Sequence, residues 1–330
     1  MPEPSRPLDP DTIEDRPVTL NQVRPVPRPG RWVSAGIVAV LAAMFIHALV
    51  TNPNLRWDVV WFYFRYDDVV KAVGWTLALT VGAMALGIVL ALITAVMRQS
   101  LNPVLRGVSY FYVWFFRGTP IYTQLVFWGL MPALYNRLSL GIPFGPEFFT
   151  FSTKEVFTGA FAAILGLGLN EGAYLSEIVR SGLNAVDHGQ REAAGALGMS
   201  NGQILRRIVL PQAMRVIVPP TGNETISMLK TTSLVLAVPF TKELTFVANS
   251  VGNRLFLPVP LLIVAALWYL IITSLLMVGQ HYLERYYGKG FDGADSDRRG
   301  GARRGRLSAR QQAILNSHTT KDNPFLEVTP

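Results

Sequence analysis

The residues of this sequence that could do chemistry lie within long apolar segments. An unpaired charge at membrane depth costs at least ~2.5 kcal/mol, so polar groups there face a bundle interior and mark a substrate or ion path. We therefore interpret these residues as the lining of a pathway and not as a catalytic centre. The predicted pathway residues are Arg117, Thr119, Glu171, Tyr174, Glu177, Glu224, Lys230 and Ser233.

Patterns typical of enzymes are missing from the sequence. There is no G-x-x-x-x-G-K-[ST], and Gly288-Lys289, the only glycine-lysine pair, is followed by Gly290. The chain has no cysteine and four scattered histidines, so no metal-ligand cluster is expected. No hydrolase motif brings serine, histidine and acid together. We expect no catalytic residue, no cofactor and no metal ion.

Composition indicates the membrane class. Half of the residues are hydrophobic, 16% are charged, and the mean hydropathy is +0.30. The net charge of +8 could indicate nucleic acid. However, the arginines gather in the tails and in alternate loops, which is the positive-inside bias of a protein embedded in membrane lipid. Nucleic acid is not an expected partner.

The elements that must position the pathway are predicted to be six transmembrane helices of an all-α membrane protein. The third contains Phe116-Arg117-Gly118-Thr119-Pro120, which requires a locally broken helix unless Arg117 reaches an interface. With both termini in the cytoplasm, the inner side holds 21 Lys and Arg and the outer loops hold six. The predicted spans are residues 32–50, 72–97, 108–131, 157–179, 216–240 and 255–283.

This topology divides the chain into four parts. Both tails are poor in aliphatic residues, so we expect them to be disordered, and the second is basic. Residues 133–156 are expected to form a loop. The parts are a cytoplasmic N-terminal tail (1–30), a first transmembrane helix with its outer loop (31–70), the main transmembrane domain (71–286) and a C-terminal tail (287–330).

Residues 187–211, DHGQREAAGALGMSNGQILRRIVLP, interrupt the apolar segments with two short capped helices. Asp187 with Gln190 is typical of an N-terminal cap, and Ser200 with Gln203 repeats the pattern. Gly198 suits the left-handed residue that ends the first helix. Pro211 is expected to end the second helix, just after Leu210.

This insert resembles the EAA loop of bacterial ABC importer permeases. The resemblance rests on Glu192-Ala193-Ala194, then Gly198, and the Ile208-x-Leu210-Pro211 ending. Further stretches resemble the polar amino acid importers among them, over about residues 75–285. These stretches are residues 116–120, 173–182, Gly189-Gln190 and 230–234.

The resemblance implies a type I ABC importer permease fold in the bacterial plasma membrane, with the insert as a pair of coupling helices. Its implied partners are a cytosolic ABC ATPase dimer that binds the ATP, a second permease subunit, identical or different, and an extracytoplasmic amino-acid-binding protein. Glutamate, glutamine, arginine and histidine all stay open as cargo. The implied ATPase-coupling residues are Gly189, Gln190, Glu192, Ala193, Ala194, Gly198, Leu210 and Pro211.

Alternatives remain at this point. A zwitterionic cargo needs a cation for its carboxylate, such as Arg117 or Lys230, and an acid for its amino group or cationic side chain. The same charges could instead pair with each other and hold helices together. An ion-gradient-driven secondary amino acid carrier is the alternative transporter, and a lipid-binding membrane scaffold is the alternative outside transport.

Overall fold

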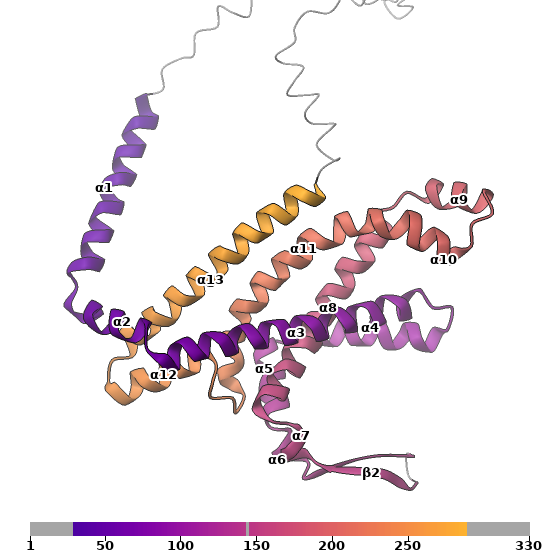
Figure 1. The fold of residues 1–330 in the computed structure, drawn as a ribbon, viewed down its shortest axis with the longest axis horizontal. Coiled ribbons are helices and arrows are strands. Elements are labelled where there is room, and N and C mark those ends of the chain that lie inside the picture. Colours follow the sequence, from indigo (N-terminus) through magenta and orange to yellow (C-terminus); the bar gives the residue numbers. More distant parts are fainter. Residues whose placement is uncertain (1–28, 143–144, 289–330) are drawn as a thin grey trace, which may run out of the picture. The chain divides into compact units, whose positions relative to one another are not determined.

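The computed structural model describes residues 29–142 and 145–288, and the predicted tails fall almost wholly outside them. Contacts divide the chain into a unit of residues 1–55 and a unit of residues 56–330. Figure 1 labels the helices and strands in the order of the chain. In the first unit, helix α1 (Pro29–Thr51) is followed by the short 3-10 helix η3 (Pro53–Leu55). The side chains of α1 from Gly30 onward are exposed, apolar ones included, which suits contact with lipid.

The second unit is mostly helical. Among the described residues, three helices of the chain are long and apolar enough to cross a membrane: Gly30–Thr51 of α1, and α3 and α13 of the second unit. The other predicted spans fall on α4 with α5, on α8 and on α11, which are broken or more polar. The longer helices are α2 (Trp57–Phe64), α3 (Asp67–Gln99), α4 (Pro103–Gly118), α5 (Ile121–Gly129), α8 (Gly159–Asn184), α9 (His188–Ala196), α11 (Leu210–Thr231), α12 (Leu244–Leu255) and α13 (Pro258–Tyr287).

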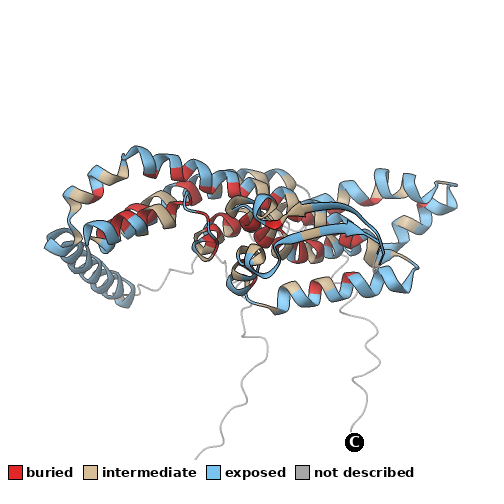
Figure 2. Cartoon of the chain, turned by 90° about the horizontal axis from the view of Figure 1, so that it is seen from below, coloured by how far each residue is buried: buried red, intermediate tan, exposed pale blue. Residues whose placement is uncertain are grey.

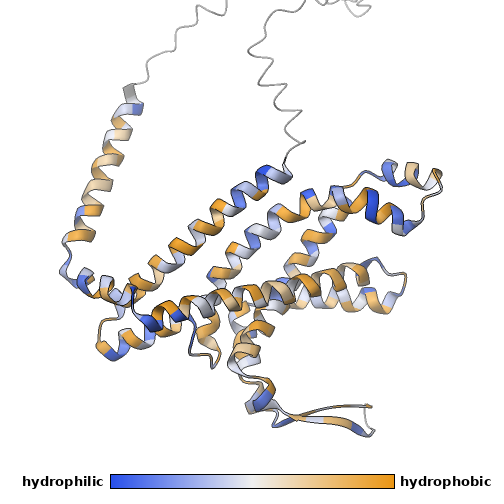
Figure 3. Ribbon diagram, in the orientation of Figure 1, coloured by the Kyte–Doolittle hydropathy of each residue, from blue (hydrophilic) through white to orange (hydrophobic). Residues whose placement is uncertain are grey.

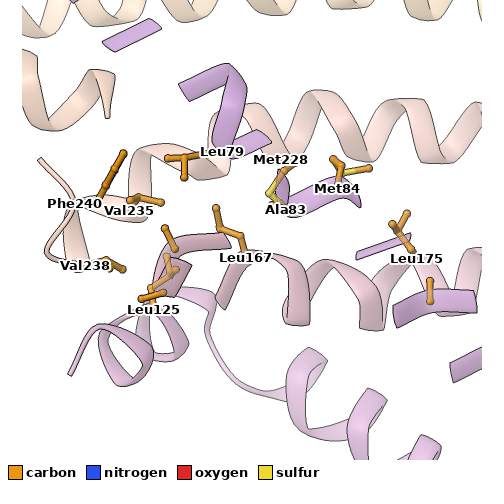
Figure 4. Close-up of a cluster of buried hydrophobic side chains, with 13 residues drawn as sticks. Leu79, Ala83, Met84, Leu125, Leu167, Leu175, Met228, Val235, Val238 and Phe240 are labelled. Carbon is orange, nitrogen blue, oxygen red and sulfur yellow. The ribbon is translucent and has the colours of Figure 1, made fainter. Parts of the chain in front are cut away.

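The helices α3 and α8 form the centre of this unit, and small residues let them approach closely. A Cβ added at Gly168 on α8 would lie 2.7 Å from the Leu86 side chain of α3, and one at Gly87 would lie 3.0 Å from Glu171. The cluster in Figure 4 joins Leu79 of α3 and Leu167 of α8 to side chains of α5 and of the segment after α11. In Figure 2 the buried residues follow the inner faces of these helices.

A second apolar cluster joins α2, α3, α12 and α13. Val69, Leu244, Leu261 and Val264 lie within it and are fully buried. It places α12 against α3 and α13, although residues 241–254 were expected to be part of an outer loop. The twelve residues of α12 are too few and too polar to predict as a membrane span. The helix is stabilised at its start by Glu243, whose carboxylate accepts from the amides of Thr245 and Phe246.

Residues 133–156 differ from the predicted loop, and the second unit is therefore not purely helical. The strands β1 (Arg137–Gly141) and β2 (Glu147–Ser152) pair antiparallel between the short helices α6 (Met131–Leu134) and α7 (Thr153–Val156). The β-branched and aromatic content of Phe148-Phe149-Thr150-Phe151 explains the second strand. Because α8 (Gly159–Asn184) follows the hairpin and precedes the insert in the chain, the hairpin and the insert lie at opposite ends of that helix (Figure 1).

Candidate functional site

Residues 187–211, called the elbow below, begin with the caps expected from the sequence. The Gly189 amide donates to Asp187 Oδ1 at 2.6 Å and starts α9. Gly198 has φ +78°, and the Met199 amide turns back to the Ala194 carbonyl at 3.2 Å. Ser200 and Gln203 form a reciprocal capping box at the start of α10 (Asn201–Ile204). Figure 3 shows hydrophilic residues on both short helices.

The prediction that Pro211 ends the second helix is wrong. The chain runs from α10 through a π-helical turn, η4 (Leu205–Val209), directly into α11. Proline has no amide to donate, and a π turn just before it re-routes the backbone bonds, so the helix continues. Gln212 stabilises the same place by donating to the Ile208 carbonyl at 3.0 Å. The elbow is thus continuous with α11 instead of hinged to it.

Apolar packing and polar contacts fix the elbow to two long helices. Val186 and Val209 are buried with Ala213 and Ile217 in a small cluster that also contacts side chains of α8. Gln212 of α11 donates to Gln190 of α9, and Arg191 of α9 donates to the Leu183 carbonyl of α8. A displacement of the elbow must therefore move α8 and α11 with it.

The predicted coupling residues divide by exposure. Ala194 is buried at 4% exposure, so its small side chain packs within this chain. Glu192 makes no hydrogen bond or ion pair with any residue that the structure describes. The residues that lie on the elbow surface are Gly189, Gln190, Glu192, Ala193, Gly198, Leu210 and Pro211.

The helix break expected in the third span lies between α4 and α5, at Thr119-Pro120. Pro120 has no amide for the Phe116 carbonyl, four residues earlier. Two side chains replace it: Gln124 Nε2 donates to this carbonyl at 3.0 Å, and Asn170 Nδ2 of α8 donates at 2.8 Å. Gln124 also donates to Thr119 Oγ1 at 2.7 Å. The break is a fixed, hydrogen-bonded feature held by α8.

Two of the predicted pathway charges have partners near these helices. The Arg117 guanidinium lies over the Tyr174 ring, 5.0 Å from its centroid. Glu177 forms ion pairs with Arg98 of α3 and with Arg180, at 2.7 Å for the latter. Glu177 therefore ties α3 to α8 near the elbow, which is the pairing role that the sequence left open.

The remaining pathway residues are placed on α8, α11 and the turn after it. Glu171 is buried, and its Oε1 has no hydrogen-bond partner. Glu224 on α11 is half-buried. Lys230 is exposed, and the Ser233 hydroxyl donates to its carbonyl at 2.8 Å. Within the described chain, Lys230 forms no ion pair.

A cavity of about 1010 Å³ lies among α3, α8, α11 and α13. Ala91, Leu175 and Ile217 are among its mainly apolar lining residues, and Thr221 and Thr225 add hydroxyls. It extends to Gln99 at the end of α3 and to Leu205 and Leu210 of the elbow. An apolar cavity with few polar groups is the usual form of a small-molecule site.

Sequence reasoning missed a buried polar network away from the elbow. Glu243 is fully buried and accepts from the Tyr269 hydroxyl of α13 and from Thr76 Oγ1 of α3, at 3.2 Å for the latter. The Leu244 amide in turn donates to Thr76 Oγ1 at 3.2 Å. The network joins α3, α12 and α13. The capping role of Glu243 was detectable in the sequence, but its two long-range partners were not.

Similarity to known proteins now identifies the class. Residues 83–289 match the family model "Binding-protein-dependent transport system inner membrane component". The arginine transport system permease protein ArgU of Corynebacterium glutamicum is 50% identical over 280 residues, 84% of this chain and 86% of that protein. The chain therefore belongs to the family of inner membrane components of binding-protein-dependent transport systems.

Two further relatives agree with this assignment. The histidine/lysine/arginine/ornithine transport system permease protein HisM of Salmonella typhimurium is 34% identical, over 61% of this chain and 82% of that protein. A solved structure described as an amino acid ABC transporter with histidines has a TM-score of 0.55 and 31% identity, covering 66% of this chain and 94% of that one. The resemblance read from the elbow and the pathway stretches is confirmed.

Proposed function

We propose that this chain forms part of the translocation path of an ATP-driven importer for cationic amino acids. The observation that carries the proposal is the elbow, whose exposed surface is joined through a buried cluster and two cross-helix hydrogen bonds to α8 and α11. Those helices line the cavity, and they carry Glu171 and Glu224. A motion imposed on the elbow would reach the pathway without a flexible joint.

The partners follow from the same surface. An ATPase dimer on the cytoplasmic side binds ATP and docks at Glu192 and Ala193. A second permease subunit, identical or different, completes the path, and a binding protein delivers cargo at the outer face. The chain crosses the bacterial plasma membrane six times, with both termini in the cytoplasm. In this topology the elbow lies on the cytoplasmic side and the hairpin on the outer side. The relatives named for arginine and for histidine, lysine, arginine and ornithine support a cationic cargo.

A single-cysteine accessibility experiment tests this arrangement, and the chain's lack of cysteine makes it clean. Ala193→Cys should react with a membrane-impermeant maleimide only in inside-out vesicles. Phe149→Cys, at a hairpin residue that is 72% exposed, should react only in right-side-out cells. The Ala193→Cys thiol should also cross-link to a co-purified ATPase. Labelling of Ala193→Cys from the outer face would contradict the proposal.

A further inference from the structure

The hairpin of β1 and β2 separates apolar from polar side chains. Residues paired across its strands share a face, and successive residues alternate between the faces. One face, called the apolar hairpin face below, is formed by two cross-strand pairs: Leu138 with Phe151 and Leu140 with Phe149. The opposite face is formed by the pairs Arg137 with Ser152 and Ser139 with Thr150. The register shifts beyond Leu140, so the division holds for these four pairs.

The apolar hairpin face is not covered by the described part of the chain. Leu140 is 64% exposed and Phe149 is 72% exposed. Apart from each other, the strands pack mainly against the short helix α7 at their base, and Figure 1 shows the hairpin extending away from the helices. A two-stranded hairpin is marginally stable in water unless another layer packs on its apolar face. The face therefore needs an occupant from outside the described chain.

The place of the hairpin in the chain favours membrane lipid as this occupant. The hairpin lies between α5 and α8, which belong to predicted spans, so its base is close to the membrane surface. Phe127 of α5 and Leu134 of α6 are also exposed, so exposed apolar side chains continue from the span toward the hairpin. Exposed apolar surface of this kind, bordered by polar residues, is typical of contact with a membrane.

Charged groups at the base of the hairpin fit the phosphates of the same lipids. Arg137 begins β1 and Lys154 follows β2, and both are exposed without an ion pair to any described residue. Even with Glu155 beside Lys154, cations are in excess there. Tyr135, just before β1, is exposed as well. Lysine, arginine and tyrosine are typical of the membrane interface, where the stem or ring contacts lipid and the polar end reaches phosphate or water.

Persistence distinguishes lipid from a protein that visits the outer face. A binding protein leaves after it delivers its cargo, and its departure would return the apolar hairpin face to water in every cycle. Exposing apolar surface to water is unfavourable each time. Lipid covers the face throughout the cycle.

We propose that the apolar hairpin face lies on the outer leaflet of the membrane, at the level of the headgroups and the first methylene groups. Arg137 and Lys154 contact lipid phosphates, while Ser139 and Thr150 remain in water. The hairpin thereby anchors the outer ends of α5 and α8, at the end of α8 that is opposite to the elbow. The contact with lipid does not depend on the cargo, and only the choice of leaflet rests on the proposed topology.

Spin labels on single cysteines test this contact in the full chain, placed in nanodiscs of phosphatidylcholine and phosphatidylglycerol. Oxygen concentrates in lipid and a nickel chelate stays in water, so the two collision rates report the surroundings of each label. Labels at Leu140→Cys and Phe149→Cys should favour oxygen. Labels at Ser139→Cys and Thr150→Cys, the matched controls on the same strands, should favour the nickel chelate. All four positions are exposed, so the substitutions leave the core intact.

Three results would overturn the proposal. The first is equal access of the nickel chelate to all four labels. The second is a Phe149→Cys label that loses contact with the nickel chelate only when the binding protein is added, which would assign the face to that protein. The third is magnetic coupling between labels of two copies, which would assign it to a second copy of this chain.

Thiol reactivity in cells separates this inference from the proposed function. Phe149→Cys and Thr150→Cys should both react with the impermeant maleimide only from the outer side, and Phe149→Cys should react more slowly because lipid shields it. Equal rates from the outer side would refute the contact with lipid alone. Reaction of both variants only from the inner side would refute the proposed topology and the outer leaflet with it.

Discussion

At the scale of single residues, side chains replace backbone groups that the sequence removes. Pro120 takes away the amide that the Phe116 carbonyl would accept from, and Gln124 and Asn170 supply donors. Gln124 is 5% exposed, so water cannot substitute for it. The pathway therefore contains a break in α4–α5 whose geometry depends on two amide side chains.

Replacing Gln124 by leucine keeps the volume but removes the donor. We expect the apparent stability of the purified chain to fall by about 1–3 kcal/mol, because the carbonyls of Phe116 and Thr119 lose a hydrogen bond in a buried place. Thermal unfolding in detergent measures the change. Thr123→Val, at the exposed neighbouring position, should stay within ~0.5 kcal/mol of the wild type. Equal melting temperatures for the two variants would show that the network has no structural role.

At the scale of elements, the closeness of α3 and α8 depends on positions without a side chain. Leu86 of α3 occupies the space where Gly168 of α8 would carry a Cβ. Gly74, also on α3, has nothing within 4 Å of its Cβ position. The same substitution should therefore have opposite consequences at the two glycines.

Gly168→Ala should destabilise the chain by about 1–3 kcal/mol, since an added methyl group must force the helices apart. Gly74→Ala should be neutral or stabilising by up to about 1 kcal/mol, because it removes backbone freedom from an open helical position. Thermal unfolding of both variants, side by side, checks the sign. A stable Gly168→Ala protein would mean that α3 can shift away from α8 at little cost.

Elements also show where sequence reasoning succeeds. The cap at Asp187, the left-handed Gly198 and the box of Ser200 with Gln203 are local, and all are present. Continuation of the helix past Pro211 was missed, because a π turn depends on how Val209 packs against α8 and not on propensity. The hydrogen bonds of Gln124 across the break were also missed, because they depend on tertiary packing and not on local propensity.

At the scale of the whole molecule, the clusters that hold the pathway together lie entirely within residues 56–288. The helix α1 belongs to the other unit and exposes its side chains. The family match likewise covers residues 83–289. Each of these clusters is therefore built from residues of the second unit.

Deletion of residues 1–55 should leave the melting temperature of the remaining chain within a few degrees of the full chain, since no buried cluster loses a member. Differential scanning fluorimetry of both proteins, expressed in the same membrane, measures this. Loss of a cooperative transition on deletion would show that α1 stabilises the second unit through contacts outside these clusters.

The π turn at Leu205–Val209 sets the rotational phase between α10 and α11. Such a turn holds one residue more than the α-helical spacing, and each residue advances a helix by about 100°. Arg206 and Arg207 are consequently turned about the axis relative to the cavity-lining face of α11. Had an ordinary α-helical turn stood there, this arginine pair would point elsewhere. The direction in which Arg206 and Arg207 of the elbow face is therefore set by the one additional residue of the π turn.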